Sequence, residues 1–219
     1  MSGAGTGTPV TPTTDYCTAA QVKAHMPDMT WGSGYDGLLA SLVSRASRLI
    51  DRHCTRENGW FKALTTATAR IYDGYNAPYT WIDECVEVDS VEVKDASTDT
   101  TYTAWASDDY ILARGSPSAP VYGKTPYTVI LVNRDLGDYA VFTTGRQTIK
   151  VTAKWGYSVD VPVDIVQAAI IQTVRWFKRG QQAFQDTGAI MELGQLRYIE
   201  ELDPDVRVLL SAYQRTCYG

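Results

Sequence analysis

The chain has 219 residues and a formal net charge of −5 at pH 7, with 44% hydrophobic and 21% charged residues. An acidic balance argues against a protein that grips DNA, because that task needs a surplus of lysine and arginine against the phosphates. No apolar run approaches the roughly 18 residues that a membrane span requires, so we expect a water-soluble globular protein without membrane contact.

Residues 1–14 are rich in glycine, threonine and proline, and they lack both a basic start and an apolar centre. They match neither a secretion signal nor a transit peptide, and we expect a flexible N-terminal arm. The four cysteines are scattered singly and only two histidines are present. This spacing favours neither a disulfide framework nor a zinc site, and it indicates a reducing compartment.

Two helical patterns follow the arm. Thr18 is placed to cap a short helix that stops at Pro27. Apolar residues at three- and four-residue spacing then predict a helix that ends before Asn58-Gly59. Its expected apolar face comprises Leu38, Leu39, Leu42, Val43, Ala46, Leu49, Ile50 and Cys54. Its other face, which includes Ser47 and Asp51, is expected to be polar.

The middle of the chain, 60–155, consists of short β-forming runs separated by Gly, Pro, Asn and Asp. The expected strands are 69–72, 86–94, 110–113, 129–133 and 148–155, with a weaker one at 101–105. Within 86–94 the alternation of apolar and polar residues slips by one position, which predicts a β-bulge.

The clearest helix follows the Gly156-Tyr157 turn. Pro162 suits a first helical position, and Gly180 can close the helix in a left-handed conformation. The apolar stripe between them predicts that Ile170 and Val174 are buried against the preceding helix. The next segment, 181–202, is expected to be a hairpin or a pliable loop.

A last short helix is predicted to start at Asp203-Pro204, with an apolar face too narrow to stand alone in water. A helix of about a dozen residues is marginal by itself, so its order must come from packing. Either its own core or a partner protein supplies that packing, and the sequence leaves both alternatives open.

Together these elements predict an α+β fold. It would be a small helical bundle, of two long helices plus short N- and C-terminal helices, with a large all-β insertion between the two long helices. The expected boundaries are an arm at 1–14, a helical core at 15–59 and 156–219, and a β insertion at 60–155.

No residue pattern predicts catalysis. His53 and Cys54 are neighbours, and neighbours point about 100° apart on a helix, so they cannot form a nucleophile–base pair with each other. The acidic stretches 107–109 and 135–138 lack the ligand register of a calcium loop and fit turns better. We therefore expect no catalytic, cofactor-binding or metal-binding residue, and no enzyme.

The order of the segments resembles the head-tail connector (adaptor) proteins in the neck of tailed bacteriophages. The resembling stretches are Tyr16-Cys-Thr18, Leu38 to Arg56 with Ala46-Ser47 and Ile50-Asp51, Arg70-Ile-Tyr-Asp-Gly74, Ser90-Val-Glu-Val93, Val151-Thr-Ala-Lys-Trp-Gly-Tyr157, and Val161-Pro162 with the helix through Arg179. They span most of 15–218. The β insertion is not matched residue by residue.

This resemblance implies a ring, commonly of about twelve copies, in the neck of a virion assembled from proteins made in the host cytoplasm. The ring would lie between the portal protein and a tail-side neck or tail protein. DNA would pass through its channel without sequence-specific binding. C-terminal segments of the family reach toward the portal, which implies a docking surface comprising Val206, Arg207, Leu209, Leu210, Tyr213 and Arg215.

The principal alternative is a carbohydrate-binding or adhesive module, because aromatic rings stack on sugars and mark interfaces. The β insertion carries Tyr72, Tyr75, Tyr79, Trp81, Tyr102, Trp105, Tyr110, Tyr122, Tyr127, Tyr139 and Phe142. Tyrosine and tryptophan are also good strand formers, which favours a core or a protein interface for many of these rings. A hydrolytic enzyme is the weakest hypothesis.

Overall fold

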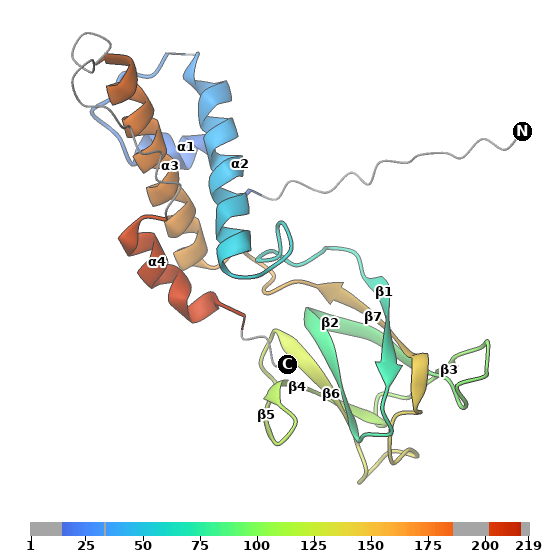
Figure 1. The fold of residues 1–219 in the computed structure, drawn as a ribbon. Helices are drawn as coiled ribbons and strands as arrows, with labels where there is room; N and C mark the ends of the chain where they lie inside the picture. The colour runs from blue at the N-terminus through green and yellow to red at the C-terminus, as the bar shows by residue number, and fades with distance from the viewer. Residues whose placement is uncertain (1–14, 33, 186–201, 216–219) are drawn as a thin grey trace, which may run out of the picture. The chain divides into compact units, whose positions relative to one another are not determined.

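The computed structural model describes residues 15–32, 34–185 and 202–215, so the expected arm and most of the predicted hairpin or loop lie outside the described residues. The chain divides into two compact units (Figure 1). The helical unit combines Met1–Gly59 with Pro162–Gly219, and the β unit spans Trp60–Val161. Within the described ranges, no helix has both the length and the apolar character of a membrane span.

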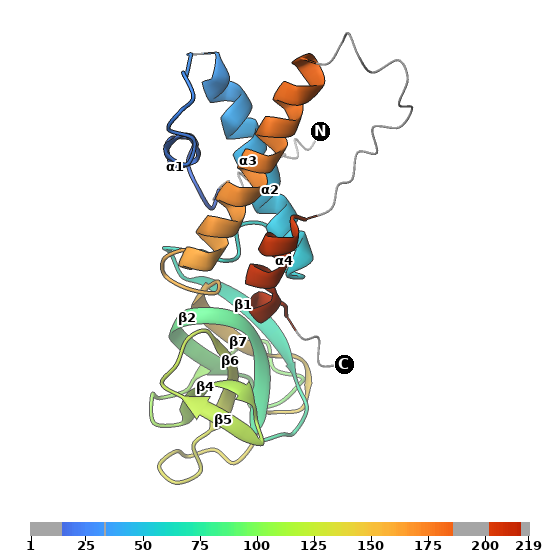
Figure 2. The ribbon, with the colours of Figure 1, turned by 90° about the vertical axis from the view of Figure 1, so that its left-hand side faces the viewer.

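The described part of the helical unit contains four α-helices and a short 3-10 turn. They are α1 (Ala19–Ala24), α2 (Tyr35–His53), α3 (Val163–Gln185), α4 (Pro204–Leu210) and η1 (Ser211–Tyr213). Helix α3 packs against α2 along one side and against α4 along another (Figure 2). Thr18 caps α1 in a reciprocal capping box with Gln21, and Asp203 caps α4, so both predicted helix starts are confirmed.

Helix α3 differs from its prediction at both ends. Pro162 precedes the helix, and its carbonyl accepts from the N–H groups of Ile165 and Val166 at 3.0 and 3.1 Å. At the other end α3 runs through Gly180 to Gln185, so the predicted stop at Gly180 is wrong. A single glycine costs a helix interior only about 1 kcal/mol, and the glutamines that follow it are good helix formers.

The buried face of the helical unit agrees only partly with the predicted stripes. Ile170 is buried as expected, whereas Val174 is only half-buried and Leu38 is 49% exposed. The expected polar face of α2 is wrong at Ser47 and Asp51, because both are fully buried. The segment before α1 covers them, and such a long-range contact leaves no trace in the periodicity of α2.

The β unit is a seven-stranded antiparallel sheet. Its strands are β1 (Thr68–Gly74), β2 (Tyr79–Val93), β3 (Thr103–Ala104), β4 (Tyr110–Ser116), β5 (Ala119–Tyr122), β6 (Tyr127–Val132) and β7 (Gly145–Trp155). The order across the sheet is β1-β7-β2-β6-β4-β5, and β3 pairs with β2. A core of its own lies against this sheet, with Trp105 stacked on Tyr139 and Phe142 at centroid distances of 4.4 and 4.8 Å.

Strand β2 is central to the sheet because it pairs with three strands, β6, β7 and β3. Its first half pairs with β6 and its second half with β7. The register shifts between Val88 and Ser90, which confirms the predicted bulge. A further shift between Cys85 and Glu87 lies near the point where the strand changes partner.

The predicted fold class, a small helical bundle carrying an all-β insertion, is wrong. The described residues contain four helices, three of them of seven residues or more, and beside them a large antiparallel sheet of seven strands. Sequence alternation located most strands individually, but it did not show that they join into one sheet with a core of its own.

The β unit ends at Val161, six residues beyond the expected limit at Trp155. The residues after β7 bond back to the start of the same unit: Tyr157 N–H donates to the Trp60 carbonyl at 2.9 Å, and Ala63 N–H donates to the Ser158 carbonyl at 2.8 Å. These bonds hold the Gly156-Tyr157 turn in the β unit.

Candidate functional site

The C-terminal helix α4 carries four of the six residues that the resemblance implies as a docking surface, and Tyr213 and Arg215 follow it. It runs antiparallel to the first half of α3, because Asp203 N–H donates to Gln172 Oε1 at 3.0 Å while the Tyr213 hydroxyl donates to Asp164 Oδ2 at 2.9 Å. An ion pair between Arg175 and Asp203 fastens the start of α4 to the same helix.

Packing on α3 separates the six predicted docking residues into three pairs. Val206 and Leu210 are fully buried within the helical unit. Leu209 and Tyr213 are half-buried, and Arg207 and Arg215 are exposed. Helix α4 therefore packs on the core of its own unit, which is one of the two alternatives that the sequence left open. Leu209, Tyr213, Arg207 and Arg215 remain at least partly accessible.

The exposed side of α4 also carries Val208, a residue that the sequence analysis missed. Its side chain is 73% exposed, although it lies between two core positions. The following turn is tied to the end of α2, since Arg56 donates to the Tyr213 carbonyl and Arg215 N–H donates to the Cys54 carbonyl at 3.2 Å. The segment that carries Val208, Leu209 and the two arginines is thus held in place at both ends.

A buried polar contact joins the chain before α1 to α2. The Tyr16 hydroxyl donates to Asp51 Oδ1, and the Tyr16 N–H donates to Ser47 Oγ at 3.0 Å. Asp51 Oδ2 accepts from the Gly59 N–H at 3.0 Å and lies 3.3 Å from Arg48 Nε. Burial raises the pKa of Asp51, and the hydrogen bond from Tyr16 opposes that rise. This network organises the helical unit and does not face solvent.

The three thiols that the structure describes are not arranged for nucleophilic chemistry. Cys17, Cys54 and Cys85 are all buried, and desolvation raises the pKa of Cys17 and Cys85 to about 12. A thiol with so high a pKa stays protonated at neutral pH and is a poor nucleophile. Within the described ranges, no group of three or more His, Cys, Asp or Glu side chains is placed to hold a metal ion.

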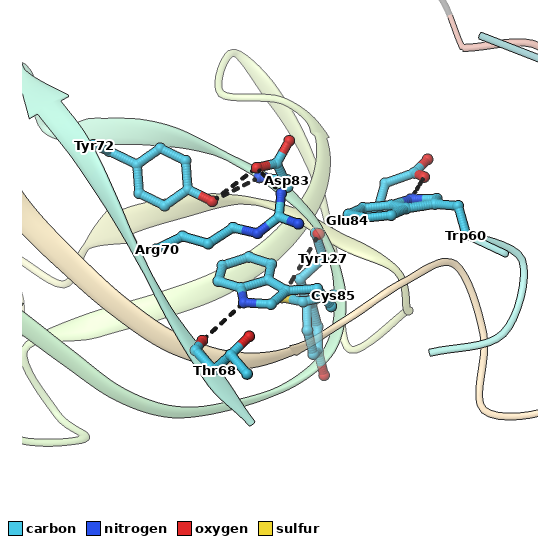
Figure 3. A network of polar contacts seen from close by, with 9 residues as sticks. Trp60, Thr68, Arg70, Tyr72, Asp83, Glu84, Cys85 and Tyr127 are labelled. Carbon is cyan, nitrogen blue, oxygen red and sulfur yellow. Dashed lines mark hydrogen bonds and ion pairs between the residues drawn. The ribbon is translucent and has the colours of Figure 1, made fainter. Parts of the chain in front are cut away.

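A second polar network braces the β unit (Figure 3). The Arg70 guanidinium lies 5.1 Å from the ring centroids of both Trp60 and Trp155, and its Nη1 is 2.7 Å from Asp83 Oδ2. The Tyr72 hydroxyl donates to the same carboxylate at 3.1 Å, and burial is the largest cause of its raised pKa. The Arg70 cation contacts two aromatic rings and forms an ion pair with Asp83, so this network stabilises the β unit.

Some of the aromatic residues of the β unit face solvent. Trp105 and Phe142 are buried in the core, whereas Tyr75 is 78% exposed. The sheet register places Trp81 and Tyr122 in one row across β2, β6, β4 and β5, and both are exposed. Tyr79 and Ile111 occupy the next row of that face. We call the surface formed by Tyr79, Trp81, Ile111 and Tyr122 the aromatic face.

The described residues thus present two contact surfaces and two internal braces. No family model matches the chain, and no curated protein matches it either. The surface at α4 combines exposed apolar side chains with arginine, and the aromatic face carries tyrosine and tryptophan; arginine and these aromatic residues are enriched where proteins bind one another. The arrangement is suited to binding.

Proposed function

We propose that this protein is a non-enzymatic structural adaptor in the neck of a tailed phage. In this role it forms a ring of about twelve copies beneath the portal protein, connects head to tail and leaves a channel for the DNA genome. Its partners are further copies of itself, the portal protein and a tail-side neck or tail protein.

The observation that carries the proposal is a contact among three of the segments that resemble the connector family: Tyr16-Cys-Thr18, the helix within 38–56 and the helix that runs through Arg179. Tyr16 bonds to Ser47 and Asp51 of α2, and the buried thiol of the adjacent Cys17 lies near the Thr173 side chain of α3, which opposes the rise of the Cys17 pKa. The segment before α1, helix α2 and helix α3 are far apart in the sequence. The three segments contribute buried residues to the core of the same helical unit. This shared core would explain why the segments occur together, in the same order, in this chain and in the connector family.

Two further features support the proposal. The net charge of −5 suits a channel wall past which DNA must slide, because an acidic surface does not hold phosphates. Helix α4 offers the exposed side chains of Arg207 and Val208, exposed Arg215 follows it, and its interior side is already anchored on α3. A rigid helix with a mixed apolar and basic edge is a suitable contact for a large partner.

Co-sedimentation with the portal ring encoded by the same genome tests the proposal. The wild-type protein should move with portal rings at a ratio near one chain per portal subunit. Val208→Asp should reduce the bound fraction, whereas Leu136→Asp, at another residue that is 76% exposed, should not. A wild-type protein that stays at the top of the gradient at micromolar concentration contradicts the proposal.

The aromatic face favours one alternative, an adhesive module that binds carbohydrate. Trp81 and Tyr122 lie in a single row, and exposed rings on a sheet can stack against a sugar. Retention of the protein on a glycan array, lost in Trp81→Ala, would support this alternative. Absence of retention, together with portal binding, leaves the adaptor as the function.

A further inference from the structure

The helical unit contains a pocket of about 370 Å³. Of its lining residues, only Arg207 also belongs to the predicted docking surface. The lining comes from α2, α3, α4 and the residue before Asp203: Arg45, Leu49, Arg52, His53, Trp176, Leu202 and Arg207. We call it the arginine pocket. It is not the buried Tyr16–Asp51 network, with which it shares no lining residue.

The geometry of α2 explains why four of these side chains converge. Arg45, Leu49, Arg52 and His53 are separated by four, three and one residues, so they lie on one side of the helix. The Arg45 guanidinium lies 5.0 Å from the ring centroid of Trp176, which α3 supplies.

The floor of the pocket is apolar and its edge is basic. Leu202 is only 7% exposed and Trp176 is half-buried, while the three arginines are exposed. Each of the two leucines and the indole offers apolar surface that a bound side chain can cover.

Among the residues that the structure describes, every ionisable residue that lines the pocket is basic, in a chain whose net charge is −5. Burial, and then the charge of Arg207, lower the pKa of His53, which favours the neutral imidazole. The pocket is therefore a local basic site on an acidic protein.

We propose that the arginine pocket binds an acidic peptide segment of a partner protein. Carboxylates of that segment bond to the guanidinium groups, which match carboxylate geometry in a bidentate manner. An apolar side chain between them packs on Trp176 and Leu202. The chemistry required of the segment is at least two acidic residues beside one apolar residue.

Two observations favour a peptide over a nucleic acid. A pocket of about 370 Å³ accommodates a few side chains, whereas a nucleic-acid strand follows an extended basic groove. The net charge of −5 also repels a polyphosphate at long range, while a short segment with two or three carboxylates is repelled much less.

The inference does not rest on the proposed portal contact. Arg207 belongs both to the pocket and to the exposed side of α4, but Arg52 projects from α2 and belongs to the pocket alone. Substitution of Arg52 therefore separates the two claims. Loss of peptide binding tests the pocket, and loss of portal binding tests the adaptor.

Fluorescence anisotropy of the full chain with a labelled peptide of alternating glutamate and leucine tests the inference. Arg52→Glu should weaken binding by at least about ten-fold, and raised salt should weaken wild-type binding. Lys178→Glu is the matched control, because it reverses an exposed charge on α3 that does not line the pocket, and it should bind like the wild type. If Arg52→Glu lowers the melting temperature, Arg52→Gln takes its place.

Several results would overturn the inference. The first is equal binding of a peptide in which glutamine replaces glutamate, and the second is equal loss in the Lys178→Glu control. Tighter binding of a single-stranded oligothymidylate would assign the pocket to nucleic acid. Sedimentation velocity without peptide provides the last arm, since self-association that requires Arg52 would make the occupant a second copy of this chain.

Discussion

The hydroxyl of Tyr16 donates a hydrogen bond to the fully buried carboxylate of Asp51, 35 residues further along the chain. Asp51 also accepts from the Gly59 N–H, so one carboxylate fastens the segment before α1 and the loop after α2 to the same point. This contact fixes the N-terminal part of the helical unit, and its loss should be measurable as stability.

Tyr16→Phe removes the hydroxyl and keeps the ring. Hydrogen bonds to charged groups contribute about 1.5–3 kcal/mol, so we expect the free energy of unfolding in urea to fall by about that amount. Tyr75→Phe is the matched control, because Tyr75 is 78% exposed and should change little. Equal stability of Tyr16→Phe and the wild type would show that Asp51 is satisfied without the hydroxyl.

Local signals in the sequence predicted local structure well. Thr18 and Asp203-Pro204 mark helix starts because a cap acts within one turn, and the slip near Val88 marks a bulge because side-chain alternation records the pleat. Strand β5 was missed, since it is four residues long and contains Pro120.

Long-range contacts could not be predicted in this way. Ser47 and Asp51 look like surface residues of α2, and their burial depends on Tyr16, which no helical period connects to them. The first half of β2 contains Asp83 and Glu84, and because acidic residues are uncommon in strands, the sequence did not predict a strand there. Arg70 and Trp60 stabilise these carboxylates there. The arginine pocket combines three helices, so its residues are adjacent only in the fold.

Gly156 should tolerate no side chain. Its φ is +138°, and a Cβ there would lie 2.4 Å from Ala63 Cα, a backbone atom that cannot move aside cheaply. Gly156→Ala should therefore destabilise the β unit by at least about 2 kcal/mol.

Gly37 is the matched control for that substitution. It lies in α2, and no atom lies within 4 Å of the place that an alanine methyl group would occupy, so Gly37→Ala should stabilise the helical unit by about 0.5–1 kcal/mol. Thermal unfolding followed by circular dichroism checks both variants. Opposite shifts are expected, and a neutral Gly156→Ala would mean that the turn can move away from Ala63.

The pKa of His53 reports on the arginine pocket. Burial and the charge of Arg207 lower it below its ordinary value of 6.5. Arg207→Gln should raise this pKa but leave it below 6.5, because burial remains. A histidine with a depressed folded-state pKa contributes stability that is complete above about pH 6.5 and declines as the pH falls through the folded pKa. An NMR titration of the imidazole, assigned with a His25→Gln variant, checks the shift, and an unchanged pKa would place Arg207 away from His53.

Helix α4 should contribute to the stability of the helical unit. Leu210 is fully buried, so Leu210→Ala should lower the free energy of unfolding by about 2–5 kcal/mol. Val208→Ala, at a side chain that is 73% exposed, should change it by less than about 0.5 kcal/mol. Deletion of residues 204–219 should likewise destabilise the helical unit. Wild-type stability of Leu210→Ala would contradict the packing of α4 on α3.

The proposed role of this chain is to join a phage head to its tail. Electron microscopy of particles from a phage with a stop codon early in this reading frame tests that role most directly. The adaptor predicts separate heads and free tails, with joining restored when the wild-type protein is supplied in trans. Intact tailed virions that lack the protein would contradict it.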